Sequence, residues 1–141
     1  MLISVENQTN FNPPLNKLEM IAQELTTREI ELIIIDSATI QELNAIHRAK
    51  DSATDVLSFP LDGDFEGLPL GSIVICDQFI YDKAKVLGHS EDDECILLFI
   101  HGLLHLLGFD HERDKGEMRD EEERLIDRFS LPKSLIVRTQ I

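Results

Sequence analysis

The chain has 141 residues, of which 43% are hydrophobic and 28% are charged, a composition that excludes intrinsic disorder and suits one globular domain over residues 1–141. Its 13 basic and 27 acidic residues give a formal net charge of −14. This charge argues against a broad nucleic-acid-binding surface, which normally appears as a basic patch.

The first half of the chain predicts strands that alternate with helices. Residues 2–7 form a candidate first strand, and the two prolines at positions 13 and 14 open an amphipathic helix. The isoleucine-rich run at residues 29–36 has the pattern of a strand buried on both faces. Ser37 is placed to cap a second helix, whose apolar residues have helical spacing.

The second half predicts two strands followed by three helices. Residues 55–59 end at Pro60, which favours an edge strand. A loop rich in glycine and proline at residues 61–70 then leads to a strand at residues 71–76. The three helices are expected at residues 77–87, 90–107 and 115–129.

These elements follow the order β-α-β-α-β-β-α-α-α. Helical connections between the early strands imply parallel neighbours, and the short strand at residues 55–59 is expected to run antiparallel at an edge. We therefore expect an α+β fold: a mixed, mostly parallel sheet with one antiparallel edge strand, packed with helices around a buried central helix at residues 90–107.

Membrane insertion and secretion are not expected. The longest nearly uncharged stretch, residues 95–109, is too short and too interrupted by histidine to span a bilayer. The first residues lack the features of a secretory signal. Cys76 and Cys95 both have apolar neighbours, so we expect two reduced thiols inside a cytoplasmic protein.

The chemically most informative segment is His101-Gly-Leu-Leu-His105-Leu-Leu-Gly108-Phe-Asp-His111. Residues four apart lie on one face of a helix, so His101 and His105 can offer imidazole nitrogens to the same ion. Gly108 can adopt the left-handed conformation that ends the helix and turns the chain back, which positions His111 as a third ligand. Three protein ligands leave an open coordination position, as in catalytic metal sites.

The apolar surroundings support a metal site. Two histidines buried on this helix would cost several kcal/mol if their polar atoms lacked strong partners, and a metal ion removes that cost. The alternative is a structural histidine held by one hydrogen bond, which suits a lone residue better than a spaced set. Cys95 lies nearly two helical turns before His101, so it is not expected to bind the ion. His47 and His89 lie outside the cluster and are expected at the surface or at helix ends.

Gly102 limits the chemistry of this site. The spacing HxxxHxxGxxH is shared with metzincin proteases, which carry a glutamate general base directly after the first histidine. Glycine at this position disfavours a glutamate-dependent protease, although a metal ion can still activate water near neutral pH. The pattern indicates a metal-dependent hydrolase. Asp110, Glu112 and Asp114 are candidates for supporting roles around the ion, or they form a solvated acidic loop.

Two motifs resemble those of the YbeY family of bacterial metal-dependent endoribonucleases. The signature H-G-x-L-H-L-x-G-[YF]-D-H matches residues 101–111. The signature R-x-K-D followed by T-[ND]-V-L-S-F-P matches Arg48, Lys50, Asp51 and residues 54–60. The length and the order of elements are similar over nearly the whole chain. One departure is Ser72, where many relatives have an acidic residue, so a role of that acid has no counterpart here.

The resemblance implies one zinc ion held by His101, His105 and His111, and cleavage of single-stranded RNA. It also implies a role in 16S ribosomal RNA 3′-end maturation and in ribosome quality control. The expected partner is the small ribosomal subunit, and binding to DNA or to a membrane is not expected. Arg48 falls on the arginine that the family is thought to use in catalysis, where a guanidinium could bind the scissile phosphate. Without the resemblance, Arg48 would be interpreted as a helix-end residue paired with an acid such as Asp51.

The leading hypothesis is therefore a zinc-dependent endoribonuclease in which a metal-activated water, or the ribose 2′-OH, attacks a phosphate held by Arg48. Lys50 is a weaker candidate for a phosphate contact. A second hypothesis keeps the metal and replaces RNA by a peptide, another amide or an ester. A third makes the chain a ribosome assembly factor with a structural metal. Three imidazoles also suit nickel, copper or cobalt, so the identity of the metal stays open.

Overall fold

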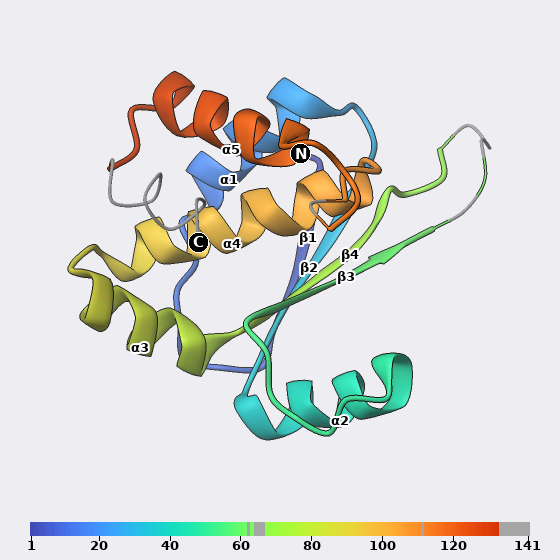
Figure 1. Cartoon of the computed structure of the whole chain (residues 1–141), viewed down its shortest axis with the longest axis vertical. Helices are drawn as coiled ribbons and strands as arrows, with labels where there is room; N and C mark the ends of the chain where they lie inside the picture. The colour runs from blue at the N-terminus through green and yellow to red at the C-terminus, as the bar shows by residue number, and fades with distance from the viewer. Residues whose placement is uncertain (62, 64–66, 111, 133–141) are drawn as a thin grey trace.

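The computed structural model of the chain describes residues 1–61, 63, 67–110 and 112–132. Within these residues the helices and strands follow the expected order (Figure 1). They are β1 (Ile3–Asn7), α1 (Leu15–Leu25), β2 (Ile30–Ile35), α2 (Ser37–Arg48), β3 (Val56–Pro60), β4 (Gly71–Cys76), α3 (Asp77–Leu87), α4 (Glu91–Leu106) and α5 (Glu117–Arg128).

The strands form one mixed sheet in the order β1-β2-β4-β3. β1 pairs with β2, and β2 with β4, in parallel, so that Ile30 lies between Ile3 and Gly71. In the described part of the chain, β3 pairs only with β4 and runs antiparallel, with Val56 opposite Ile75. The parallel pairs are joined through helices, whereas β3 and β4 are connected directly. The predicted α+β class and the antiparallel edge strand are confirmed.

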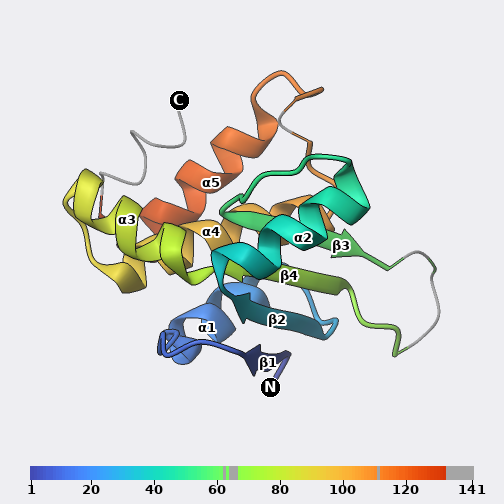
Figure 2. The same ribbon diagram turned by 90° about the horizontal axis from the view of Figure 1, so that it is seen from below.

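Helix α4 is the centre of the fold. It lies with α1, α3 and α5 on one side of the sheet, while α2 covers the other side over β3 and β4 (Figures 1 and 2). Eleven of the 16 residues of α4 are buried, so the helix is enclosed over most of its surface. This burial confirms the central helix predicted at residues 90–107 and leaves only a narrow part of α4 for chemistry.

The predicted N-terminal cap is observed for α4, whereas α2 is capped by a different residue from the predicted one. Ser90 caps α4, since its Oγ accepts a hydrogen bond from Asp93 N at 3.0 Å. Asp36, and not Ser37, caps α2, because its carboxylate accepts from Thr39 N at 2.8 Å. Hydrogen bonding from the side chain of Thr39, together with this bond from its backbone, holds the pKa of Asp36 below its ordinary value. A carboxylate competes well for this position because it also complements the positive end of the helix dipole.

The two cysteines are free and buried, as expected. Burial raises the pKa of the Cys95 thiol to about 12, which keeps it protonated and unsuited to metal binding. None of the helices in the described part of the chain combines the length and the hydropathy needed to cross a bilayer.

Candidate metal centre and active-site cleft

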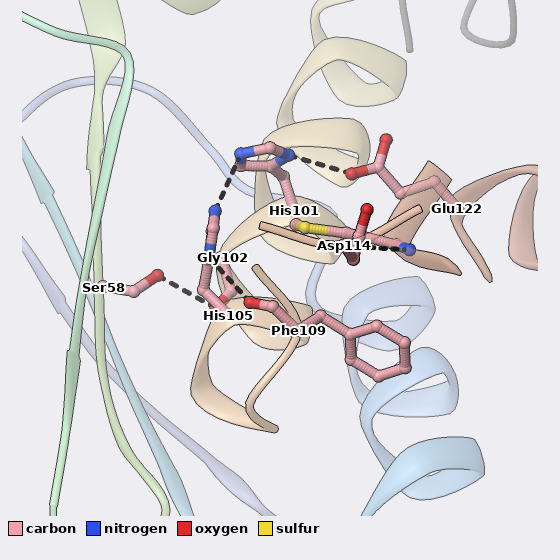
Figure 3. A network of polar contacts seen from close by, with 8 residues as sticks. Ser58, His101, Gly102, His105, Phe109, Asp114 and Glu122 are labelled. Carbon is pink, nitrogen blue, oxygen red and sulfur yellow. Dashed lines mark hydrogen bonds and ion pairs between the residues drawn. The ribbon is translucent and has the colours of Figure 1, made fainter. Parts of the chain in front are cut away.

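His101 and His105 lie one turn apart on α4 and face each other (Figure 3). Their Nε2 atoms are 3.2 Å apart, with ring centroids at 4.7 Å and an angle of 78° between the ring planes. The side chain of His101 is 31% exposed, although both flanking positions on the helix are buried. The paired nitrogens therefore lie where the buried helix reaches the surface.

The other ring nitrogens are held by protein oxygens. His101 Nδ1 lies 2.9 Å from Oε1 of Glu122, a buried carboxylate on α5, and His105 Nδ1 lies 3.1 Å from the carbonyl oxygen of Phe109 (Figure 3). A carbonyl or an ionised carboxylate can only accept a hydrogen bond, so each Nδ1 carries the proton. In the neutral rings, both Nε2 atoms then direct lone pairs toward the same space.

This arrangement fits a metal ion. With both Nδ1 atoms protonated, two Nε2 atoms at 3.2 Å are close enough to bind the same cation. Two imidazole nitrogens that share a tetrahedral zinc ion at 2.0–2.1 Å are about 3.3 Å apart, close to the observed separation. No group of three metal-binding side chains occurs among the described residues. The predicted third ligand, His111, lies outside them.

The turn after α4 positions the carbonyl that orients His105. Gly108 has a φ of 99°, a left-handed conformation that favours glycine. It reverses the chain so that Phe109 N donates to Leu104 O at 3.0 Å, and the Phe109 carbonyl reaches back to His105. The predicted helix-ending role of Gly108 is confirmed.

Gly102 lies at the closest approach of α4 to the sheet. A Cβ atom there would be 2.8 Å from Ile73 Cγ2, 3.2 Å from Ser58 Oγ and 3.3 Å from Val56 Cγ2. Ser58 Oγ also donates a hydrogen bond to Gly102 O at 2.9 Å (Figure 3). The position that carries glutamate in the metzincin pattern is therefore filled by the sheet.

A cleft of about 770 Å³ opens beside the histidine pair. Residues from α2, β3 and the turn after α4 line it together with His101 and His105: His47, Arg48, Thr54, Asp55, Val56, Leu57, Ser58, Phe59, Pro60, Gly108, Phe109, Asp110 and Glu112. The fold thus brings Arg48 to the same cleft as two of the predicted metal ligands, from a position 53 residues before the first of them.

Arg48 is exposed at the end of α2, and no ion pair joins it to Asp51 among the described residues. The Asp51 carboxylate instead accepts a hydrogen bond from Gln41 Nε2 at 3.0 Å. Arg48 thus lies at a helix end, as the alternative interpretation expected, but the ion pair with Asp51 is not observed among the described residues. Lys50 is exposed as well but does not line the cleft.

Three acidic residues near the histidines have different environments. Asp114 accepts hydrogen bonds from Gly116 N at 2.8 Å and Met118 N at 3.0 Å, so its carboxylate holds the start of α5. Asp110 lies 3.5 Å from the guanidinium of Arg113. Asp110 and Glu112 line the cleft, whereas Asp114 does not.

His89, His47 and Ser72 lie outside the histidine cluster of α4. His89 lies between α3 and α4, but its side chain is only 2% exposed and Nε2 is 2.7 Å from Oε1 of the fully buried Glu94. His89 therefore lies at a helix end, one of the two predicted kinds of position, and its ring is buried there because the buried carboxylate requires a polar partner. His47 is exposed, as expected. Ser72, at the position of the family's acid, donates to Glu31 Oε1 at 2.8 Å.

Sequence reasoning missed Glu122, although the sequence contained a signal for it. Met118, Glu122, Leu125 and Phe129 follow helical spacing and are all buried, so one carboxylate interrupts the apolar face of α5. A buried carboxylate is rarely found without a partner. Its partner here is His101, which lies 21 residues away in the sequence.

The chain is similar in sequence and fold to known proteins. The chain matches the family described as Endoribonuclease YbeY over residues 4–130. It is 56% identical to a protein named Endoribonuclease YbeY from Sulfurovum sp. (strain NBC37-1), with 97% of each chain covered. It is 57% identical to the protein of that name from Campylobacter jejuni (strain RM1221), over 86% of this chain and 90% of the relative. A solution structure of a Thermotoga maritima protein shares the fold, with a TM-score of 0.60 and 26% identity over 90% of this chain and 88% of that one.

Proposed function

This chain belongs to the YbeY family of endoribonucleases, and from that premise we propose that it is a zinc-dependent enzyme that cleaves single-stranded RNA in the cleft beside His101 and His105. One observation carries the proposal: two imidazoles present Nε2 lone pairs at 3.2 Å, and the cleft beside them also contains Arg48. Gly102 weighs against a peptidase, because the position of the glutamate base has no room for a side chain.

His101, His105 and His111 would hold the ion. A zinc ion bound there would supply Lewis-acid chemistry, which polarises a phosphoryl oxygen and acidifies a water molecule. Glu122 and the Phe109 carbonyl fix the tautomers and orientations of the first two imidazoles. Because three imidazoles also accept other transition metals, the ion has to be identified by elemental analysis of the purified protein.

Arg48 would hold the scissile phosphate. A guanidinium binds two phosphate oxygens at once and stays charged throughout the reaction. No described acidic residue forms an ion pair with Arg48, so its donors remain available to the substrate. The attacking group is a water or the ribose 2′-OH. A product that ends in a 2′,3′-cyclic phosphate identifies attack by the 2′-OH, and a linear phosphate formed directly identifies water.

Replacing Arg48 by alanine is expected to lower kcat/KM for single-stranded RNA by about 100- to 1,000-fold. This is the usual cost of removing one hydrogen-bond donor that stabilises the charge of the transition state. Arg48→Lys should recover only part of this loss, because an ammonium lacks the planar fork. Lys83→Ala, which removes an exposed cation from α3, should cleave like the wild type. Equal rates for the wild type and Arg48→Ala would contradict the role of the arginine.

Glu122→Gln is expected to lower metal affinity or RNA cleavage by about 10- to 100-fold, the usual cost of losing an outer partner of a metal-binding histidine. The amide keeps the shape of the side chain but loses the charge that holds the Nδ1 proton of His101. Asp127→Asn makes the same chemical change at an exposed position on α5 and should have no effect. Zinc titration of both variants against a chelating dye, followed by cleavage assays, checks this prediction.

The biological setting extends the proposal. The expected substrate is the 3′ end of 16S ribosomal RNA on the small ribosomal subunit, in the cytoplasm, where cleavage would serve maturation and quality control. Incubation of the zinc-loaded enzyme with small subunits that carry unprocessed 16S RNA tests this substrate. Correct 3′ ends should form with the wild type and not with His105→Ala.

Chelation separates a catalytic metal from a structural one. If the ion is catalytic, EDTA should abolish cleavage while the far-UV circular dichroism spectrum persists, and added zinc should restore the rate. Unfolding on chelation would instead favour an assembly factor with a structural metal. The partial exposure of His101 at the cleft supports the catalytic role.

A further inference from the structure

The charged residues of the cleft are too few to hold RNA through phosphate contacts alone. Among the described residues that line it, Arg48 is the only one with a permanent positive charge, whereas Asp55, Asp110 and Glu112 are acidic. Each phosphate neutralised on a single strand contributes about −0.7 to the slope of log K against log salt. One arginine therefore supplies a small electrostatic share, and contacts that do not depend on charge have to supply more.

An aromatic pair in the same cleft can supply such a contact. His47, in the last turn of α2, lies edge-to-face against Phe59 of β3, with ring centroids 5.0 Å apart and 66° between the ring planes. His47 is exposed, whereas Phe59 is partly buried and packs against the small core that includes Leu57 and Val74. Phe59 is therefore fixed by the core, and it supports the exposed ring of His47.

The pair is also positioned for a nucleotide. His47 directly precedes Arg48, and both line the cleft that contains His101 and His105. In a nucleotide, one ribose joins the phosphate to the base, so a base whose phosphate binds Arg48 is within reach of the neighbouring residue in the same cleft. Aromatic side chains bind bases of single strands by stacking, and they accept every base because each has a π face.

We propose that His47 and Phe59 form a stacking site for one nucleobase of the RNA strand whose phosphate binds Arg48. The inference rests on the proposed function and adds a substrate subsite to it. His47 provides the exposed ring, and Phe59 holds that ring in place from β3. The site recognises the flat face of a base and not its identity, which suits a nuclease that selects single strands, since the bases of a duplex are stacked on one another.

Abasic RNA provides the test. A single-stranded oligonucleotide with one defined cleavage position is prepared in its intact form and with an abasic residue at each position around the scissile phosphate. The zinc-loaded wild type should lose about 5- to 150-fold in kcat/KM at one abasic position, the range expected for one stacked base. His47→Ala should show a similar loss on intact RNA and no further loss at that abasic position.

Two further variants separate stacking from other roles of these residues. His47→Phe should retain activity on intact RNA, because stacking needs a ring and not an imidazole. Ile46→Ala removes a 74% exposed side chain from the adjacent position on α2 and should cleave like the wild type. Phe59→Leu keeps apolar volume against the core but removes the ring that supports His47, so the difference in cleavage between intact and abasic RNA should shrink in a folded protein. Thermal unfolding of each variant checks that it is folded.

Several results would overturn the stacking site. These are equal cleavage of intact and abasic RNA by the wild type, wild-type activity in His47→Ala, or the same abasic penalty in both proteins. Each leaves the proposed function intact. If the wild type cleaves no single-stranded RNA, the proposed function fails, and the same comparison is made by fluorescence anisotropy. Equal binding of intact and abasic RNA by the wild type then overturns the subsite. Weaker binding of one abasic RNA by the wild type, with no such difference in His47→Ala, supports it.

Discussion

Replacing His105 by alanine is expected to abolish RNA cleavage and to remove bound zinc while the fold persists. The substitution deletes one of the two Nε2 atoms that face each other at 3.2 Å, so the remaining ligands would hold the ion far more weakly. The loss should exceed the 10- to 100-fold cost of removing an outer partner such as Glu122. Elemental analysis of the purified variant and single-turnover cleavage of a labelled oligonucleotide measure the two effects.

The chelated wild type is the matched control for this variant. If His105 acts through the metal, the melting temperatures of the wild type and His105→Ala should differ in zinc and converge in EDTA, because ligand binding to the native state supplies the difference. A variant that binds zinc as tightly as the wild type, or that cleaves RNA at the wild-type rate, would show that His105 is not a ligand.

Substituting Gly102 should have the largest effect on stability. Alanine gains about 1 kcal/mol in helix propensity over glycine. Overpacking costs typically 1–3 kcal/mol, and a Cβ atom at 2.8 Å from Ile73 Cγ2 favours the upper part of that range. We therefore expect Gly102→Ala to lower the free energy of unfolding by about 1–2 kcal/mol, and the melting temperature by roughly 3–8 °C.

Gly102→Glu should prevent stable folding. It inserts a carboxylate at a buried position against two strands, which costs several kcal/mol out of a total stability of about 5–15 kcal/mol. The glutamate of the metzincin pattern thus cannot be restored in this fold without moving β3 away from α4. Urea denaturation of the wild type and both variants, followed by far-UV circular dichroism, measures the expected order of stability: the wild type highest, Gly102→Ala lower and Gly102→Glu lowest.

A double-mutant cycle with Ile73 tests the cause of the instability. Ile73→Ala removes the methyl group nearest to the added Cβ atom and leaves a cavity of its own. Gly102→Ala should then cost less in the Ile73→Ala background than in the wild type, because the new methyl group can enter the vacated space. Equal costs in both backgrounds would locate the strain elsewhere.

The sequence by itself determined the order of the helices and strands, and it placed two of the three predicted metal-binding histidines on one helix face. Strand and helix periodicity is local, so the order of elements and the antiparallel edge strand at residues 55–59 were predicted and are observed. The spacing of His101 and His105 fixes their common helix face for the same reason. The glycine at position 108 predicted the turn that ends α4. Zinc binding and the role of His111 remain predictions.

Only the tertiary structure decided which distant residues surround those histidines. Glu122 reaches His101 because α5 packs on α4, and Arg48 reaches the cleft because α2 and β3 meet at the edge of the sheet. Position 102 requires glycine because Ile73 and Ser58 approach it closely. The sequence showed only that the glutamate of the metzincin pattern is absent there. The contacts of Glu122 with His101, and of Gly102 with Ile73 and Ser58, join residues more than 20 positions apart. Their geometry follows from how whole elements pack, and the local periodicity that predicts an element carries no information about its neighbours in space.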